Sequence, residues 1–269
     1  MTRHGLGPGR GQDGTDGRSQ VAGGDRPRGS GELTHDRLTA QRGRDVSAGT
    51  PEFDTGTTVV GLTAQDAVVL AADRRMSLGG RFTANKSVQK VEQVHPTAAM
   101  GISGSVGPAQ DLLRSLRAEA SLYESRRGEP MSVGALAQTA GGLVRGLPVT
   151  PLLGGVEAAQ GEEGPSAHVY SLDGGGSVLE DEYVATGSGL QVAYGVLERR
   201  YDPEASVETA TEAAAAAVAA ASERDTASGN GCTLTTITAE GVETVAREDP
   251  LDGGTQTEAG ATGGTEEVA

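Results

Sequence analysis

GTTVVGLTAQDAVVLAAD, residues 56–73, contains two short Val-rich runs separated by a turn at Ala64-Gln65-Asp66. Apolar, β-branched runs of this length on either side of a turn predict two β-strands. Apolar residues occupy both faces of each run, so we expect both strands to be covered on both sides. The second run ends on a carboxylate, Asp73. A buried strand pair is therefore expected to begin the fold at Thr57.

Strand and helix patterns alternate in blocks after this pair. The pattern predicts a strand at 98–103, helices at 107–126 and 132–147, strands at 151–156, 167–172, 177–180 and 183–186, helices at 190–201 and 206–224, and strands at 233–238 and 242–246. Ser132 is expected to cap the second of these helices. Strand blocks alternating with helix pairs fit a layered α+β protein with two sheets between helical layers.

Both ends of the chain differ in composition from the middle. Residues 1–53 are rich in Gly, Arg and Asp and offer almost nothing to bury, and the segment from residue 249 is similar but acidic. Such segments cannot bury enough apolar surface to offset the entropy of ordering. We predict that 1–56 and 249–269 are disordered and that 57–248 is the folded domain.

The chain carries a formal charge of −15, and its charge is unevenly distributed. Residues 1–56 hold eight Arg and eight Asp plus Glu, so the remainder carries the entire net charge. This argues against a nucleic-acid partner, because phosphate contacts need a cationic surface. Lys86 and Lys90 are the only lysines. An acidic, lysine-poor surface is what we expect of a protein that works in high salt, although a GC-rich genome would also replace Lys with Arg.

The compartment is suggested by what the sequence lacks. Cys232 is the only cysteine, which excludes an internal disulfide. No apolar run approaches the roughly 20 residues that span a bilayer, and the first residues lack the apolar stretch of a signal peptide. These features predict a soluble, cytoplasmic protein without a membrane partner.

Gly56–Thr57 joins the leading segment to the first strand. A hydroxyl needs a base to become a nucleophile, and an N-terminal Thr carries one in its α-amine, whose unperturbed pKa is about 8. Cleavage would have to expose that amine, and a Gly on the acyl side obstructs attack least. By itself, a Gly–Thr pair is far more often a turn before a strand.

Three further features support a catalytic site at Thr57. Asp73 ends an apolar strand and needs a cationic partner if it is buried, and Lys90 lies in the next strand-like segment. Such a pair would lower the proton affinity of a nearby amine and hydroxyl. Gly104 lies in a Gly-rich turn before a helix, where backbone amides can stabilise an oxyanion. Each feature alone is more often a surface charge or an ordinary connection.

Several separate motifs together resemble the β subunit of the archaeal proteasome, and haloarchaeal members most closely. The resemblance covers about 57–245 and rests on GTTVVGL, AVVLAADRRMS, NKSVQKVEQVHPTAAMGISGSVGPAQ, LRAEASLYESRRGE, PLLGGV, ATGSGLQVAYGVLE and ERDTASGNG. It implies a four-layer αββα sandwich of the N-terminal nucleophile hydrolase type. It also implies a threonine endopeptidase, a zymogen that cleaves itself at Gly56–Thr57 and uses no metal or organic cofactor.

The resemblance implies roles at matching positions. Thr57 is then the nucleophile, and its freed amine is the base. Asp73 and Lys90 form the supporting charge pair, and the Gly104 amide stabilises the oxyanion. The residues implied to orient the amine are Ser188, Asp225 and Ser228, which the sequence alone would identify only as loop and cap residues.

The sequence departs from the family pattern at several positions, one of them, Met76, near the expected substrate pocket. Met76 and Ser103 replace smaller residues, Val59 replaces a Thr, and one extra residue lies near Gly79. None of these changes removes a group that the mechanism needs. The expected pocket residues are Met76, Ser77, Val88, Ile102 and Val106. They predict cleavage after large hydrophobic residues, a preference that Glu92 would complicate.

The implied partners are other β subunits in a heptameric ring, α subunits, an ATPase ring of the AAA type and unfolded protein substrates. Three alternatives remain open at this stage. They are another N-terminal nucleophile hydrolase acting on a small amide, a β-type subunit that never matures, and a bacterial proteasome-like peptidase. The helix motif and the presence of Thr57, Asp73 and Lys90 favour the archaeal β subunit.

Overall fold

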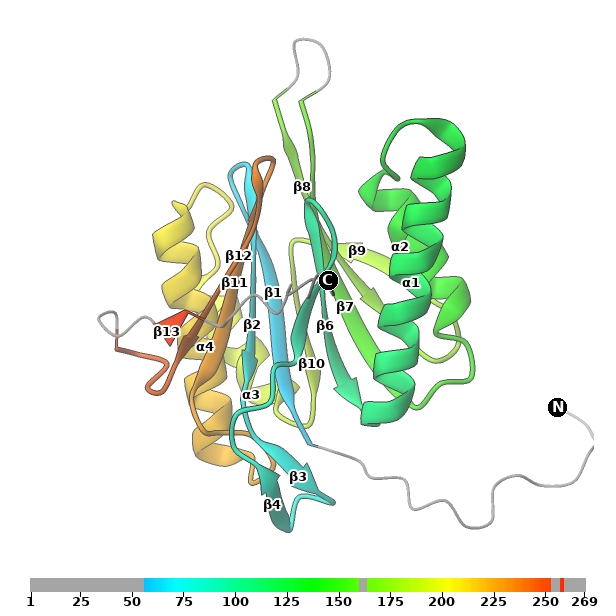
Figure 1. Cartoon of the computed structure of the whole chain (residues 1–269). Helices are drawn as coiled ribbons and strands as arrows, with labels where there is room; N and C mark the ends of the chain where they lie inside the picture. Colours follow the sequence, from blue (N-terminus) through cyan, green and yellow to red (C-terminus); the bar gives the residue numbers. More distant parts are fainter. Residues whose placement is uncertain (1–55, 160–163, 253–256, 259–269) are drawn as a thin grey trace, which may run out of the picture. The chain divides into compact units, whose positions relative to one another are not determined.

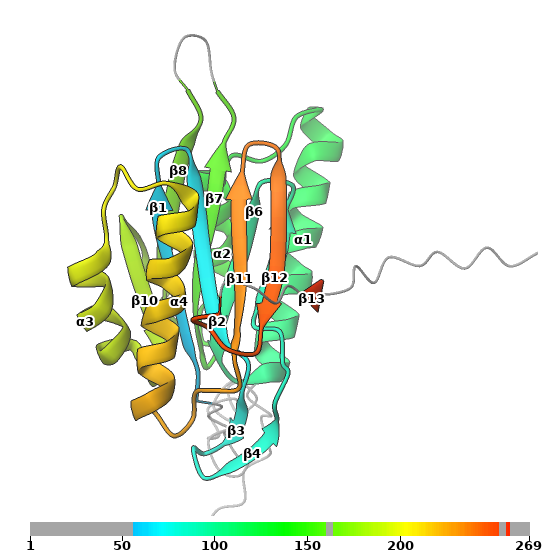
Figure 2. The ribbon, with the colours of Figure 1, turned by 90° about the vertical axis from the view of Figure 1, so that its left-hand side faces the viewer.

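Two β-sheets pack face to face, and a pair of helices covers the outer face of each sheet (Figures 1 and 2). The computed structural model describes residues 56–159, 164–252 and 257–258. These layers confirm the predicted α+β sandwich with two sheets between helical layers. The layering also explains why the first two strands are apolar on both faces.

The first sheet has the strand order β10-β1-β2-β11-β12-β13, and all its neighbours are antiparallel. Its strands are β10 (Tyr183–Gly187), β1 (Thr58–Ala64), β2 (Ala67–Asp73), β11 (Cys232–Thr238), β12 (Gly241–Arg247) and β13 (Thr257–Glu258). The helices α3 (Leu190–Arg200) and α4 (Val207–Arg224) cover its outer face. The Ala-rich face of α4 lets the helix lie close to β1 and β2.

The second sheet has the order β5-β6-β7-β8-β9. Its strands are β5 (Val91–His95), β6 (Ala98–Gly104), β7 (Val149–Glu157), β8 (Ser166–Leu172) and β9 (Val178–Asp181). The helices α1 (Val106–Arg127) and α2 (Val133–Leu143) cover its outer face. Ser132 caps α2, because its side chain accepts a hydrogen bond from the Ala135 amide at 3.2 Å.

A third apolar cluster fills the space between the sheets, with Val59 and Leu70 from one sheet and Leu152 from the other. The sheets approach closely where glycine replaces a side chain. A Cβ at Gly101 would lie 2.5 Å from Cγ1 of Val59, closer than real Cβ contacts come. All seven residues of β2 are buried, so Asp73 at its end enters a dry interior.

The structure differs from the sequence expectation in two places near the site. A two-stranded ribbon, β3 (Met76–Leu78) with β4 (Phe82–Asn85), was not predicted, since its exposed β4 lacks an apolar pattern. Lys90 was expected within a strand but instead immediately precedes β5. This position leaves its side chain able to reach across to Asp73.

The predicted disordered segments lie mostly outside the described residues. Gly56 is the only residue of the leading segment that the structure describes. In the C-terminal segment it describes residues 249–252 and β13, and β13 pairs with Val245 and Ala246 of β12. Within the described ranges, no helix is both long and apolar enough to cross a membrane.

Candidate active site

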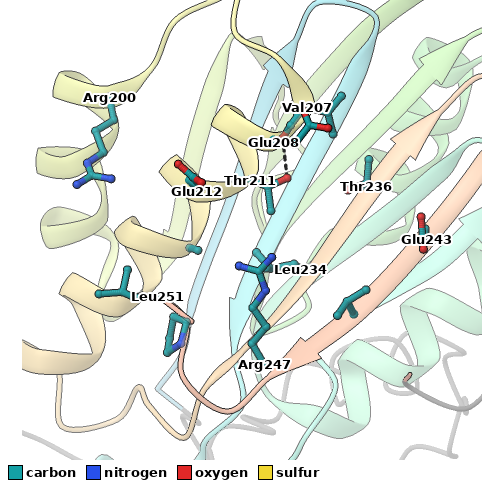
Figure 3. A pocket seen from close by; sticks show the side chains of 13 residues that line it. Arg200, Val207, Glu208, Thr211, Glu212, Leu234, Thr236, Glu243, Arg247 and Leu251 are labelled. Atoms are coloured by element: carbon teal, nitrogen blue, oxygen red, sulfur yellow. Dashed lines mark hydrogen bonds between the residues drawn. The ribbon is translucent and has the colours of Figure 1, made fainter. Parts of the chain in front are cut away.

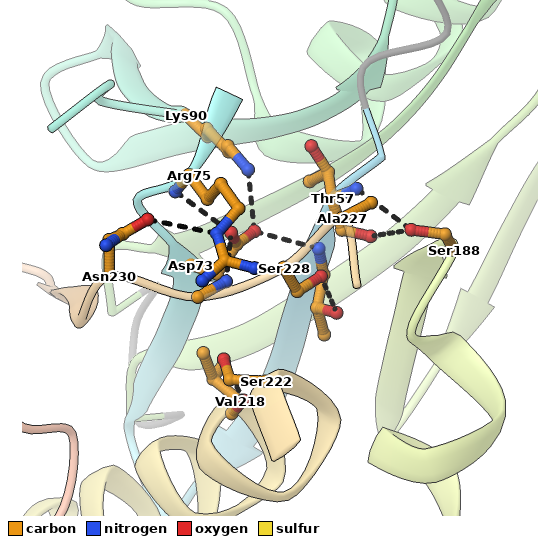
Figure 4. Close-up of polar contacts among 12 residues, drawn as sticks. Thr57, Asp73, Arg75, Lys90, Ser188, Val218, Ser222, Ala227, Ser228 and Asn230 are labelled. Atoms are coloured by element: carbon orange, nitrogen blue, oxygen red, sulfur yellow. Dashed lines mark hydrogen bonds and ion pairs between the residues drawn. The ribbon is translucent and has the colours of Figure 1, made fainter. Parts of the chain in front are cut away.

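Thr57 lies immediately before β1 and is 1% exposed (Figure 4). Its backbone N–H donates to Ser188 Oγ at 3.1 Å. Ser188 follows β10, the strand that pairs with β1, so sheet pairing brings together residues 131 positions apart. Ser188 Oγ in turn donates to Asp225 Oδ2 at 2.6 Å. The backbone nitrogen of Thr57 is therefore linked to a carboxylate through one hydroxyl.

Asp73 and Lys90 form a buried ion pair, as the sequence predicted (Figure 4). Lys90 Nζ lies 2.6 Å from Asp73 Oδ1, and their side chains are 6% and 0% exposed. Burial lowers the pKa of Lys90, and the Asp73 carboxylate opposes that shift by favouring the charged form. A buried charge of this kind is stable only with several partners.

Backbone amides supply the other partners of the Asp73 carboxylate. The amide of Thr58 donates to Oδ1 at 3.0 Å, while those of Arg75 and Gly229 donate to Oδ2 at 3.0 and 2.9 Å. Charge-assisted hydrogen bonds such as these are among the strongest in proteins. They fix the carboxylate and join β1, β2 and the loop after α4 at a single side chain.

The loop 225–231, between α4 and β11, completes the polar cluster. Ser228 Oγ donates to Asp225 Oδ2 at 2.6 Å and lies 2.8 Å from Thr58 Oγ1. Since Ser228 donates its single proton to the carboxylate, Thr58 must donate to Ser228. The structure thus brings all of the predicted polar residues together around Thr57, and it adds Thr58, which sequence reasoning missed.

Arg75 is a second residue that sequence reasoning missed. Its Nε donates to Asn230 Oδ1 at 3.0 Å, and its Nη1 donates to the carbonyl of Thr226 at 2.8 Å. Asn230 has a φ of +65° and Gly229 a φ of +148°, conformations that few side chains tolerate. Arg75 therefore holds in place a loop whose backbone conformations suit Gly and Asn (Figure 4). Its only sequence signal is its position two residues after Asp73.

Gly104 ends β6 with a φ of +110°. A Cβ there would lie 2.5 Å from the carbonyl oxygen of Pro148, so the position is restricted to glycine both by space and by conformation. Gly104 and Thr57 line the same two cavities. The predicted Gly-rich turn therefore does lie beside the predicted nucleophile.

The smaller of these cavities has a volume of about 130 Å³. Four of the five predicted pocket residues line it: Met76, Val88, Ile102 and Val106. Ser77 does not line it; it is 1% exposed, and its Oγ has no hydrogen-bond partner in the described part of the chain. Glu92 also lines the cavity.

The other cavity at Thr57 has a volume of about 360 Å³, and hydroxyl side chains are among those that line it. Ser103 Oγ lies there 2.6 Å from Thr150 Oγ1 and 3.2 Å from Thr186 Oγ1. Thr57 thus lines both a mainly apolar cavity and one with several hydroxyl side chains.

A larger cavity of about 530 Å³ lies between α4 and the β11–β12 pair, and it shares no lining residue with the cavities at Thr57 (Figure 3). Its charged residues are Arg200, Glu208, Glu212, Glu243 and Arg247. Over the described ranges there is no group of three or more His, Cys, Asp or Glu residues that could hold a metal ion.

A sequence profile of the family described as "Proteasome subunit" matches residues 53–237. The chain belongs to the proteasome subunit family. It is 56% identical to the proteasome subunit beta of Halorhabdus utahensis over 201 residues, which cover 74% of this chain and 83% of the relative. It is 58% identical to proteasome subunit beta 2 of Haloarcula marismortui over 198 residues, covering 72% and 84% of the two chains.

The proteasome subunit beta of Halomicrobium mukohataei is also similar, at 54% identity over 208 residues that cover 76% of this chain and 85% of the relative. These relatives place the chain among the β subunits of archaeal proteasomes, which are threonine-type peptidases of the core complex. The predicted family, fold and enzyme class are confirmed. The domain boundaries and the roles of individual residues remain predictions.

Proposed function

We propose that this chain is a threonine endopeptidase that cleaves its own Gly56–Thr57 bond and then uses Thr57 as an N-terminal nucleophile. The observation that carries this proposal is the convergence on Thr57 of a buried Asp73–Lys90 pair and a hydroxyl–carboxylate cluster that holds its backbone nitrogen. A hydroxyl next to a desolvated cation and a positioned nitrogen has what nucleophilic catalysis requires. Neither group is needed at an ordinary strand start.

Gly56 supports self-cleavage because no other residue fits there. A Cβ at this position would lie 1.9 Å from Cβ of Ala227. In the proposed step, Thr57 Oγ attacks the Gly56 carbonyl carbon, a C–O bond forms, and the C–N bond breaks as the Thr57 nitrogen takes the hydroxyl proton. Water then hydrolyses the ester, releasing residues 1–56 as a propeptide and freeing the amine.

The mature site repeats this chemistry on a substrate peptide. The Thr57 amine accepts the hydroxyl proton, since an α-amine with a pKa of about 8 is partly neutral near pH 7. The positive charge of Lys90 lowers the proton affinity of both groups. The Gly104 amide stabilises the oxyanion, while Ser188, Asp225 and Ser228 orient the amine. The leaving amine departs, and water hydrolyses the acyl ester.

The proposed substrates are unfolded proteins, cut mainly after large hydrophobic residues that enter the cavity lined by Met76, Val88, Ile102 and Val106. The proposed assembly has seven β subunits in a ring, flanked by α subunits and fed by an AAA ATPase in the cytoplasm.

Intact-mass measurement of the assembled particle tests the proposal. We expect the wild-type subunit to begin at Thr57, whereas Thr57→Ala should keep its leading segment and lose peptidase activity. Thr57→Ser retains a hydroxyl and should still be processed, which separates loss of chemistry from loss of folding. An unprocessed wild-type subunit in an assembled, peptide-cleaving particle would exclude the mechanism. A native mass too small for a ring would contradict the proposed assembly.

A further inference from the structure

Glu92 is the one acidic side chain among the residues lining the apolar cavity beside Thr57. It follows Val91 on β5, and successive strand residues point to opposite faces. Val91 is buried between the two sheets, so Glu92 points to the other face, toward α1. The second charged lining residue, Lys90, is already paired with Asp73. Glu92 therefore determines whether this cavity carries a net negative charge.

Arg117 on α1 lies against this carboxylate. Its Nη2 is 3.0 Å from Glu92 Oε2, and its Nε and Nη2 donate to the Gln93 carbonyl at 2.8 and 2.6 Å. Arg117 follows Leu113, a lining residue, by four positions, so it extends the same helix face by one turn. The backbone contact fixes the guanidinium where it neutralises Glu92 at the cavity.

We propose that Arg117 is a specificity-determining residue, which neutralises Glu92 so that the cavity accepts apolar rather than basic side chains before the cleaved bond. The inference rests on the proposed function of this cavity and refines it. Without Arg117, the Glu92 carboxylate is free to pair with a Lys or Arg side chain of the substrate. A guanidinium at Arg117 and a basic substrate side chain compete for the same two oxygens.

The pair is half exposed, with side chains 42% and 38% accessible for Arg117 and Glu92. Its electrostatic effect is consequently screened by salt, because the Debye length falls from about 10 Å at 0.1 M to about 3 Å at 1 M. A purely structural role of Arg117 would not give a charge-dependent selectivity. Salt dependence of the selectivity is therefore a signature of the proposed mechanism.

The test uses the assembled particle and two fluorogenic peptides that differ only in having Leu or Arg before the cleaved bond. The quantity measured is the ratio of kcat/KM for the Arg peptide to that for the Leu peptide. We expect Arg117→Met to raise this ratio roughly three- to fivefold at 0.1–0.2 M salt and less at 1 M, as is typical of exposed pairs. Arg117→Lys keeps the charge and should restore most of the wild-type ratio.

Two controls identify the cause. Arg114→Met removes the same charge from the same helix, at a side chain that is 68% exposed and pairs with Asp111, and should leave the ratio unchanged. Adding Glu92→Gln to Arg117→Met should return the ratio to near its wild-type value. A ratio that stays at the wild-type value in Arg117→Met, or stays raised in the double variant, would overturn the inference. A wild-type particle that cleaves neither peptide would instead contradict the proposed function.

Discussion

Two ion pairs each contribute one residue to the smaller cavity at Thr57, and the pairs differ mainly in their exposure to water. Lys90–Asp73 has an N–O distance of 2.6 Å and side chains 6% and 0% exposed, whereas Arg117–Glu92 has 3.0 Å and 42% and 38%. A buried charge that loses its partner costs about 3–5 kcal/mol, while an exposed pair contributes about 0–1 kcal/mol. We therefore expect loss of the buried pair to affect the proposed chemistry and loss of the exposed pair to affect only selectivity.

The largest expected effect comes from breaking the buried pair. Lys90→Met leaves the Asp73 carboxylate buried without its cation and removes the charge beside Thr57. We expect peptidase activity to fall on the order of 10³-fold and processing at Gly56–Thr57 to stop, because an electrostatic contribution of this size is lost. Peptide hydrolysis and intact mass measure both effects.

The matched control for this variant is Lys90→Arg, which keeps the charge but changes the geometry at Asp73. It should assemble and retain more activity than Lys90→Met. Native mass shows whether each variant still forms the particle. An assembled Lys90→Met particle that is processed and keeps a tenth of wild-type activity would show that the two ion pairs do not differ as proposed.

Substitution of Arg75 tests the same contrast at a residue that positions the proposed catalytic groups and takes no part in the proposed reaction itself. Its guanidinium holds loop 225–231, which carries Asp225 and Ser228, through hydrogen bonds to Asn230 and Thr226. We expect Arg75→Met to lower kcat about 10- to 100-fold with a smaller change in KM, since misplacing catalytic groups by about 1 Å has such effects.

Arg81→Met is the control for Arg75→Met, since Arg81 is exposed in the turn of the β3–β4 ribbon. Steady-state kinetics of the two variants should separate a positioning role from a general loss of positive charge. Equal kinetics for Arg75→Met and Arg81→Met would remove Arg75 from the site. A change in KM alone would indicate a contact with substrate instead.

The sequence predicted the fold better than it predicted the hydrogen-bond network of the site. The strands at 57–73 could be predicted because both of their faces are apolar, and Ser132 could be predicted as a helix cap. The β3–β4 ribbon was missed because β4 is mostly exposed, with Phe82 66% accessible, so burial imposes no pattern there.

At the site, Thr57, Asp73 and Lys90 could be proposed from local chemistry, since a nucleophile and a buried charge pair have requirements of their own. Ser188 and Ser228 could not, because their hydrogen bonds to Thr57 and Thr58 span 131 and 170 residues. Only the resemblance to a family supplied them. Thr58 and Arg75 were missed by both routes, since each acts through a contact made by the folded loop 225–231.

The smallest expected effect concerns Cys232, which lies opposite Asp73 in the β2–β11 register and shares its dry environment. Burial raises the pKa of the Cys232 thiol from 9.0 to about 11. The unfolded chain loses this proton first as the pH rises above 9, so the thiol's contribution to stability declines between pH 9 and 11. At pH 10 this titration lowers the free energy of unfolding by about 1 kcal/mol.

Urea unfolding of wild type and Cys232→Ala at pH 8 and pH 10 measures this contribution. The alanine variant loses packing at both pH values, so only the difference between its two free energies of unfolding reports the thiol. We expect its stability to fall less between pH 8 and pH 10 than that of wild type. An identical fall would mean that water reaches this end of β2, and the contrast between the buried and the exposed ion pair would then lose its physical basis.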